Sequence, residues 1–354
     1  MCRPGSSHNF LAYPLAGGGA LAMQMRLAWS AITAPAGCFL AHGNHPMTAR
    51  AATGVGLIAV LLWSSLATLT VLASGIPPLQ LEAMSFAIGA LIGAGYLAVS
   101  AEARRELRHL SWPAVALGVG GLLGFHFFYF LSLGSAPPLQ ANLINYLWPL
   151  LIVLFSALLP GNPDRLRWNH VLGALVALAG AVLAITQGRL DLGGFSGAAF
   201  GYAAALAAAL TWASYSVLSR LFAAVPSSAV TLYCAATAIA AALGHGVAEE
   251  TTWPLTSGQW LAVILMGLGP VGLAFYVWDY GCKHGDLRVL GAAAYFAPLL
   301  SSGMLMALGL AEATPAIWIA ACAITAGALL ASKDLLRGRE KPAAPSTKSA
   351  SAAA

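Results

Sequence analysis

The sequence predicts an all-α integral membrane protein with ten transmembrane helices, arranged as two inverted five-helix repeats around a central cavity. Three observations support this fold: long uncharged segments, a charge bias between alternate connectors, and an internal repeat. Charged residues make up 8% of the 354 residues and hydrophobic residues 59%. Residues 51–81, 83–101, 192–219 and 313–332 contain no Asp, Glu, Lys or Arg. A helix needs about 20 apolar residues to cross a bilayer, and these runs lack the alternation of barrel strands.

The composition also excludes several classes of protein. A soluble domain would carry about a quarter charged residues. The net charge of +5 is scattered over connectors, so it does not indicate nucleic-acid binding. The five cysteines form no CxxC pair, and the sequence has no HExxH, P-loop, GxSxG or paired carboxylate motif. We therefore expect no enzyme activity, no metal and no cofactor.

Charges and Pro/Gly breaks divide the chain into ten predicted helices. They lie near residues 51–73, 79–100, 112–134, 138–159, 168–187, 196–219, 227–246, 258–281, 288–310 and 314–334. Residues 1–46 lack a strong apolar core, and Met47 directly precedes a full hydrophobic span. We expect residues 1–46 to be a disordered leader or an over-extended start. Residues 336–354, rich in Ala, Ser, Pro and Lys, are expected to be a disordered cytoplasmic tail.

The connectors between these helices alternate in charge. One set carries most of the basic residues: Arg50, Arg104, Arg105, Arg108, Arg165, Arg167, Arg220, Lys283, Arg288, Lys333, Arg337, Arg339 and Lys341. The other set has Glu249, Glu250, Glu312 and a single basic residue, Arg189. Because cytoplasmic loops are enriched in Lys and Arg, this bias places both termini in the cytoplasm and favours an even number of spans.

An internal repeat relates the two halves of the chain. Trp63 in Leu-Trp-Ser-Ser recurs as Trp212 in Thr-Trp-Ala-Ser, and Tyr146-Leu-Trp-Pro-Leu-Leu recurs as Tyr295-Phe-Ala-Pro-Leu-Leu, each 149 residues further on. Each half, residues 47–190 and 191–335, holds five predicted spans. Because five is odd, the halves must enter the membrane in opposite orientations, as in many secondary transporters. The alternative is a chance match between apolar segments.

With these features the chain resembles the drug/metabolite transporter superfamily in its EamA-type branch, over about residues 51–335. The resemblance rests on the five-plus-five organisation, the repeated Trp motif, and the prolines in the fourth and ninth helices. The Tyr146-Leu-Trp-Pro149 segment and the aromatic content look most like bacterial aromatic amino-acid exporters. The resemblance implies that the first, third, fourth, sixth, eighth and ninth helices surround a central cavity.

The fourth predicted helix carries a polar stripe. Asn142, Asn145, Tyr146 and Pro149 fall at i, i+3, i+4 and i+7, which is one face of a helix. Amides within the bilayer are expected to face protein or water. Pro149 and Pro298 each lack an N–H and so free a carbonyl one turn earlier, where a substrate ammonium could bind. The alternative is an ordinary kink whose carbonyl is satisfied by a neighbouring side chain.

Several aromatic residues lie inside their predicted spans rather than at the membrane interfaces. They are Trp63, Trp148, Trp212, Tyr146, Tyr276 and Tyr295. Interfacial positions are where Trp and Tyr usually act as anchors, so interior rings point to another role. They can stack on a flat substrate side chain or form a gate, and simple core packing is the alternative.

His126 is the only ionisable side chain in the middle of the third predicted helix. It could hydrogen-bond a substrate carboxylate or relay a proton, because imidazole titrates near neutral pH. The alternative is a neutral histidine bonded to a backbone carbonyl. Glu82 and Asp279 lie near the ends of their spans, and we expect both to be interfacial.

The sequence therefore predicts a bacterial inner-membrane secondary transporter that exports aromatic and other neutral amino acids by alternating access. We expect a monomer whose partners are its small-molecule substrate and the lipid bilayer. Within the same family, the alternative is an exporter of another small metabolite or of a cationic drug. Alternatives from another class are an intramembrane enzyme and a channel.

Overall fold

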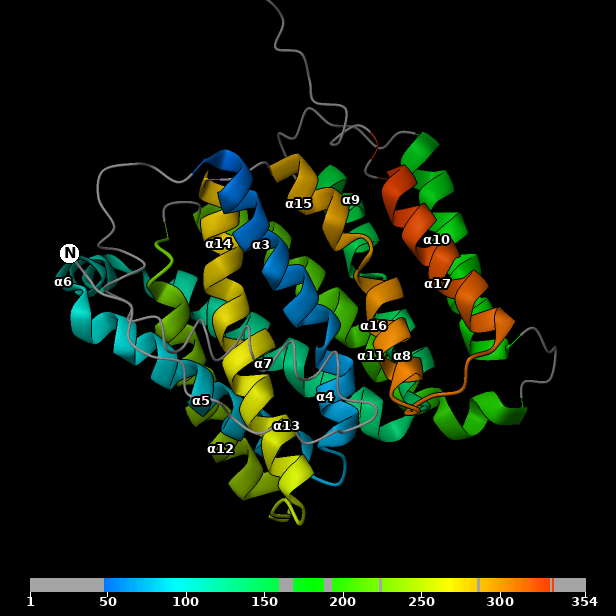
Figure 1. Cartoon of the computed structure of the whole chain (residues 1–354), viewed down its shortest axis with the longest axis horizontal. Coiled ribbons are helices and arrows are strands. Elements are labelled where there is room, and N and C mark those ends of the chain that lie inside the picture. Colours follow the sequence, from blue (N-terminus) through cyan, green and yellow to red (C-terminus); the bar gives the residue numbers. More distant parts are fainter. Residues whose placement is uncertain are drawn as a thin grey trace, which may run out of the picture. The chain divides into compact units, whose positions relative to one another are not determined.

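The structure is a computed structural model that describes residues 48–158, 168–187, 193–222, 225–284, 287–331 and 333. The predicted leader, residues 1–46, and the predicted tail, residues 336–354, lie outside these ranges. All regular secondary structure within the ranges is helical (Figure 1). The prediction of an all-α fold is therefore confirmed for the described part of the chain.

The helices of the first half follow one another with short connections. They are α3 (Ala49–Ser64), α4 (Leu66–Leu72), α5 (Pro78–Val99), α6 (Ala101–Glu106), η1 (Leu107–His109), α7 (Trp112–Ser135), α8 (Pro138–Asn145), α9 (Trp148–Leu158) and α10 (Trp168–Thr186).

The second half repeats this organisation. Its helices are α11 (Gly193–Leu218), η2 (Ser219–Phe222), α12 (Ala229–Ala248), α13 (Ser257–Leu268), the π-helical turn η3 (Gly269–Leu273), α14 (Ala274–His284), α15 (Leu287–Ala294), α16 (Ala297–Ala307) and α17 (Pro315–Ala331).

Within the described residues, seven helical segments are long and apolar enough to cross a membrane. They are Ala49–Leu72, Pro78–Val99, Trp112–Ser135, Trp168–Thr186, Gly197–Leu218, Ala229–Ala248 and Ser257–Trp278. The other three predicted spans are also helical, but in shorter pieces. The predicted span at 138–159 falls on α8 and α9, that at 288–310 on α15 and α16, and that at 314–334 on the 17-residue α17.

Local sequence explains where several helices begin. Prolines occupy the first turn of α5, α7, α8 and α16, where their missing N–H costs nothing. Thr256 caps α13 in a capping box with Gln259. Gly75 adopts a φ of 91° in the tight turn between α4 and α5, a conformation that a side chain would disfavour.

Two helix breaks occur at repeat-related positions. The fourth predicted helix stops at Asn145 and resumes at Trp148, while the ninth stops at Ala294 and resumes at Ala297. Each break lies just before a proline, Pro149 in α9 and Pro298 in α16. Because proline cannot donate to the carbonyl four residues earlier, both breaks follow from the sequence.

Helices of the two halves pack in pairs. The main pairs are α3 with α14, α5 with α12, α7 with α11, and α10 with α17 (Figure 1). Small residues allow close contact, because a Cβ at Gly281 of α14 would lie 2.6 Å from the Gly56 Cα of α3. In the same way, a Cβ at Gly173 of α10 would lie 2.5 Å from the Gly327 carbonyl oxygen of α17.

Candidate functional site

An aromatic chain begins at Trp63 on α3. Its ring centroid lies 5.2 Å from that of Trp278 and 5.9 Å from that of Phe275, both on α14. The Trp63 indole N–H donates a hydrogen bond of 3.2 Å to the Pro270 carbonyl in η3. The π-helical turn therefore positions the first of the two repeat-related tryptophans, and the N–H of this half-buried indole is satisfied.

The same chain continues to Trp212 on α11. Phe275 lies 6.4 Å from Trp212, which in turn lies 5.0 Å from Phe125 of α7. Phe125 stacks on Tyr129 at 5.6 Å with an interplanar angle of 14°. Aromatic pairs at such separations attract one another through offset and edge-to-face geometry. The two predicted tryptophans are thus linked through a single ring, Phe275.

The chain ends in a buried polar network. The Tyr129 hydroxyl donates to Asn142 Oδ1 at 2.8 Å, and Asn142 Nδ2 donates to Ser301 Oγ at 2.9 Å. Ser301 also hydrogen-bonds the hydroxyl of Tyr146. These four side chains come from α7, α16 and the segment that ends α8, and all are buried. Asn145, three residues after Asn142, is also buried, and its Oδ1 has no hydrogen-bond partner among the described residues.

His126 lies beside this chain in an aromatic cage. Its ring centroid is 4.8 Å from those of Phe86 and Phe125, both nearly perpendicular to it, and 5.7 Å from that of Phe130. Its Nδ1 lies 2.9 Å from the Leu122 carbonyl oxygen. Because a carbonyl can only accept, Nδ1 is the donor in this contact. This is the second of the two arrangements that the sequence left open, a histidine bonded to its own helix.

The remaining predicted residues lie apart from this network or make other contacts. The Tyr276 hydroxyl pairs with Thr231 Oγ1 at 2.7 Å, and its ring lies edge-on to Tyr96, so it faces α5 and α12. Trp148 is half-buried against the core at the start of α9. Tyr295 is half-buried within the break between α15 and α16.

Four residues of the network were not among the predicted site residues: Phe125, Tyr129, Phe275 and Ser301. Phe275 directly precedes the predicted Tyr276, and one helical residue step turns a side chain by about 100°. That step decides which of the two rings contacts both tryptophans. The sequence therefore indicated the right segment of α14 but the wrong one of its two adjacent rings.

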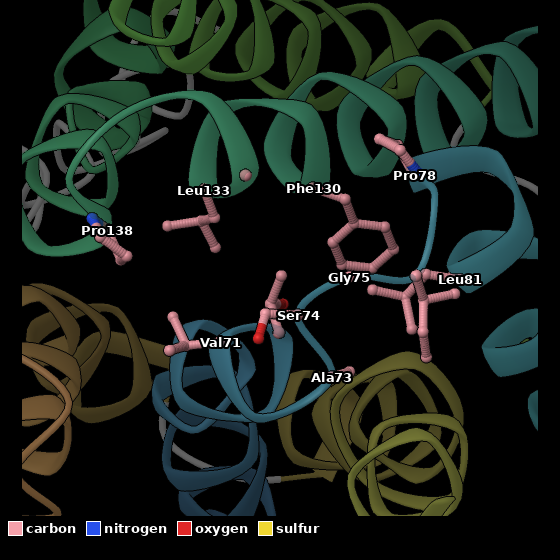
Figure 2. Close-up of a pocket in the computed structure, with 12 residues that line it drawn as sticks. Val71, Ala73, Ser74, Gly75, Pro78, Leu81, Phe130, Leu133 and Pro138 are labelled. Carbon is pink, nitrogen blue, oxygen red and sulfur yellow. The ribbon is translucent and has the colours of Figure 1, made fainter. Parts of the chain in front are cut away.

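A pocket of about 230 Å³ lies near one end of this site. Figure 2 shows Phe130 and Leu133 projecting from α7 into it, opposite Val71 and the turn containing Ser74. Phe130 is also one of the rings around His126. Phe130 therefore links the pocket both to His126 and, through its contact with Tyr129 at 6.2 Å, to the aromatic chain.

The site carries aromatic, amide and hydroxyl groups. Within the part of the chain that the structure describes, no three His, Cys, Asp or Glu side chains are grouped to hold a metal ion. This combination of side chains suits a small solute with an apolar or aromatic body and a few hydrogen-bonding groups. Phosphorylated ligands would instead call for Arg or Lys.

The chain is similar in sequence to several known proteins. The EamA-like transporter family matches the chain twice, over residues 51–186 and 199–333. The aromatic amino acid exporter YddG of Ancylobacter novellus is 47% identical over 288 residues, which cover 80% of this chain and 98% of the exporter. The protein of the same name from Escherichia coli K12 is 26% identical, covering 80% of this chain and 97% of its own.

A solved crystal structure is similar as well. It superposes with a TM-score of 0.62 at 44% sequence identity, covering 80% of this chain and 98% of the other. The two segments that match the family, residues 51–186 and 199–333, contain every residue of the aromatic chain.

Proposed function

Because the chain belongs to the EamA-like transporter family, we propose that it exports aromatic and other neutral amino acids across the bacterial inner membrane. It is a multi-pass membrane protein, with seven apolar helices of spanning length in the described residues. The names of its relatives as aromatic amino acid exporters support the substrate class. The observation that carries the proposal is the aromatic chain that ends in the Asn142–Ser301 pair.

The proposed architecture has ten spanning segments in two inverted repeats, with both termini in the cytoplasm. The helix pairs support it. If the halves are exchanged, the pair α3 with α14 becomes α11 with α7, while the pairs α5 with α12 and α10 with α17 map onto themselves. Such a pattern is expected of two halves related by a two-fold axis. The matching breaks before Pro149 and Pro298 add a second, independent correspondence.

The proposed substrate site lies along the aromatic chain. Faces of Trp63, Trp212 and Phe275 would stack on an aromatic or thioether side chain. The amides of Asn142 and Asn145 and the Ser301 hydroxyl would hydrogen-bond the amino and carboxylate groups. The carbonyls that Pro149 and Pro298 leave without a helical donor, those of Asn145 and Ala294, suit an ammonium group.

The proposed mechanism is alternating access through rocking of the two halves. The site residues come from both halves, so a relative rotation would change which end of the site is open. The breaks in the fourth and ninth helices lie next to the polar network, where a change of helix angle would move Tyr146 and Ser301 together. Pro149 and Pro298 would then act as the hinges.

Counterflow in proteoliposomes tests the proposal. Vesicles that contain the purified full-length chain and unlabelled phenylalanine should take up labelled phenylalanine, methionine and threonine faster than empty vesicles. Excess unlabelled amino acid outside should compete with the label. Transport of another small metabolite or of a cationic drug, together with no movement of any of the three amino acids, would refute the proposed substrate class.

A further inference from the structure

Glu82 lies in the second turn of α5 and is completely buried, with an exposed side-chain fraction of 0%. The sequence predicted an interfacial position near the end of its span, and the structure adds that the side chain is buried within the protein. The helix begins at Pro78, so Glu82 lies about one turn from the α4–α5 connection. The adjacent Leu81 lines the pocket of Figure 2. This carboxyl group near the end of a predicted span is therefore enclosed by protein.

Both carboxyl oxygens of Glu82 lack a hydrogen-bond partner among the described residues. A nearby acid shows the usual alternative. Glu249 accepts hydrogen bonds from the backbone N–H groups of Leu79 and Gln80 at 3.0 and 3.1 Å, and it pairs with His245 Nδ1 at 2.9 Å. Glu249 therefore has the donors that an anion needs at a helix N-terminus, and Glu82 has none.

The surroundings of Glu82 offer no compensating positive charge. Among the described elements packed on α5, α13 and η3 carry no titratable residue, and α7 contributes only His126 and Tyr129. Helix α6 carries Glu102, Arg104, Arg105 and Glu106, but it follows the C-terminal end of α5, the opposite end from Glu82. The titratable residues of α12 are Tyr233, Cys234 and His245, and His245 is already paired with Glu249. The electrostatic neighbour of Glu82 is Glu249, which has the same sign.

An ionised Glu82 carboxylate would have an unfavourable free energy at this position. Burial removes its hydration, and neither hydrogen bonds nor a counter-charge compensate for that loss. Binding a proton removes the charge. A carboxyl group at such a position would hold a proton while it is closed to water and would release it when a conformational change admits water.

Glu82 is also connected to the substrate site. Phe86 lies one turn further along the same buried face of α5, and its ring contacts His126 at 4.8 Å. His126 in turn contacts Phe125, a member of the aromatic chain. Movement of the halves that opens the pocket would therefore act on the helix face that holds Glu82.

We propose that Glu82 is a proton-binding site that couples export to proton movement in the opposite direction. This inference rests on the proposed function. In each cycle a proton from the outer side binds a Glu82 carboxylate oxygen and later leaves to water on the inner side, while an amino acid moves outward. No covalent bond other than that to the proton forms or breaks.

Accumulation in proteoliposomes tests the coupling. The electrical potential is clamped at zero with potassium and valinomycin, and labelled methionine starts at equal concentration on both sides. With an acidic interior and a gradient of about one pH unit, exchange of one proton for one amino acid allows about tenfold accumulation inside. Glu82→Gln should abolish the accumulation and keep counterflow, whereas the exposed neighbour of Glu249, changed as Glu250→Gln, should keep both.

Each outcome has a separate meaning. Wild-type counterflow without gradient-driven accumulation overturns the role of Glu82 and leaves the proposed function standing. Accumulation by Glu82→Gln at the wild-type level also overturns it. Absence of wild-type counterflow removes the proposed function and this inference with it.

A second variant covers the case in which Glu82→Gln loses counterflow as well. Glu82→Asp keeps an ionisable carboxyl group, so recovery of accumulation in this variant supports the inference. If Glu82→Asp runs as a single monodisperse species in gel filtration and yet moves no amino acid in counterflow, Glu82 has a structural role and the inference fails.

Discussion

At the scale of single residues, Phe275 is the ring that connects the two repeat-related tryptophans of the site. Its ring contacts both Trp63 and Trp212, which lie 149 residues apart in the sequence. Its neighbour Tyr276 points to α5 and α12 instead, where its hydroxyl meets Thr231. The rotation of α14 about its axis therefore assigns one ring to the site and the other to helix packing.

Trp212 is the residue whose removal should affect transport most clearly. It contacts Phe125, Tyr215 and Phe275, and we propose that it stacks on the substrate. An aromatic contact contributes about 0.5–1.5 kcal/mol beyond its buried area. We therefore expect Trp212→Ala to lower the counterflow rate at subsaturating phenylalanine by about tenfold, which corresponds to about 1.4 kcal/mol.

Trp168→Ala is the matched control for this prediction, because Trp168 is 74% exposed at the start of α10. It should transport phenylalanine at the wild-type rate. Equal rates for the two variants would remove Trp212 from the substrate site and leave core packing as its role.

At the scale of helices, the closest approach in the α3–α14 pair depends on two glycines. A Cβ at Gly281 would lie 2.6 Å from the Gly56 Cα and 3.0 Å from the Gly56 backbone nitrogen. Backbone atoms cannot move aside as the end of a flexible side chain can. The helix that carries Trp63 and the helix that carries Phe275 can therefore approach this closely only if both positions stay small.

Gly281→Ala should destabilise the protein, because the added methyl group forces α3 and α14 apart. Overpacking of this kind typically costs about 1–3 kcal/mol. Thermal unfolding of the detergent-purified protein measures the effect as a lower melting temperature. Gly54→Ala is the control, since a Cβ there meets nothing within 4 Å. On helix propensity alone this control should be neutral or stabilising by up to about 1 kcal/mol.

If Gly281→Ala melted at or above the temperature of Gly54→Ala, the close approach of the two backbones would not limit stability. The same result would show that α3 and α14 can separate without loss of the bundle.

At the scale of the whole molecule, the two halves contribute side chains to each other's packing and to one site. Every main helix pair joins a helix of the first half to a helix of the second. One end of the described bundle is held by contacts between the first turn of α5 and the segment after α12. The Glu249 carboxylate accepts hydrogen bonds from the backbone N–H groups of Leu79 and Gln80, and Gln80 Oε1 accepts one from the Thr252 N–H at 2.9 Å.

The proposed topology places this end of the bundle outside the cell. In a background without native cysteines, Ser74→Cys and Thr251→Cys should react with a membrane-impermeant maleimide in intact cells. Ser100→Cys, at the end of α5, should react only after the membrane is permeabilised. Labelling of all three in intact cells, or of Ser100→Cys alone, would contradict the proposed orientation.

Much of the fold was predictable because it depends on properties that lie along the chain. Apolar length determined where the helices lie, and the prolines at 149 and 298 marked the two related breaks. The repeated Trp and Tyr motifs identified two related halves, and the family match over both halves agrees with them. Of the predicted site residues, Trp63, Asn142, Tyr146 and Trp212 lie in the network of contacts.

Hydrophobic length and internal repetition are enough to predict a helical, multi-pass membrane protein with two related halves, because both can be found without knowing which helices pack together. The packing of the helices, which the sequence does not reveal, makes Phe275 rather than Tyr276 the ring that joins the tryptophans, and it encloses the Glu82 side chain in protein. When nearly all residues of a helix are apolar, their order does not show which face of the helix packs against which neighbour. The neighbouring helices determine which side chains contact one another and which carboxyl group is buried from solvent.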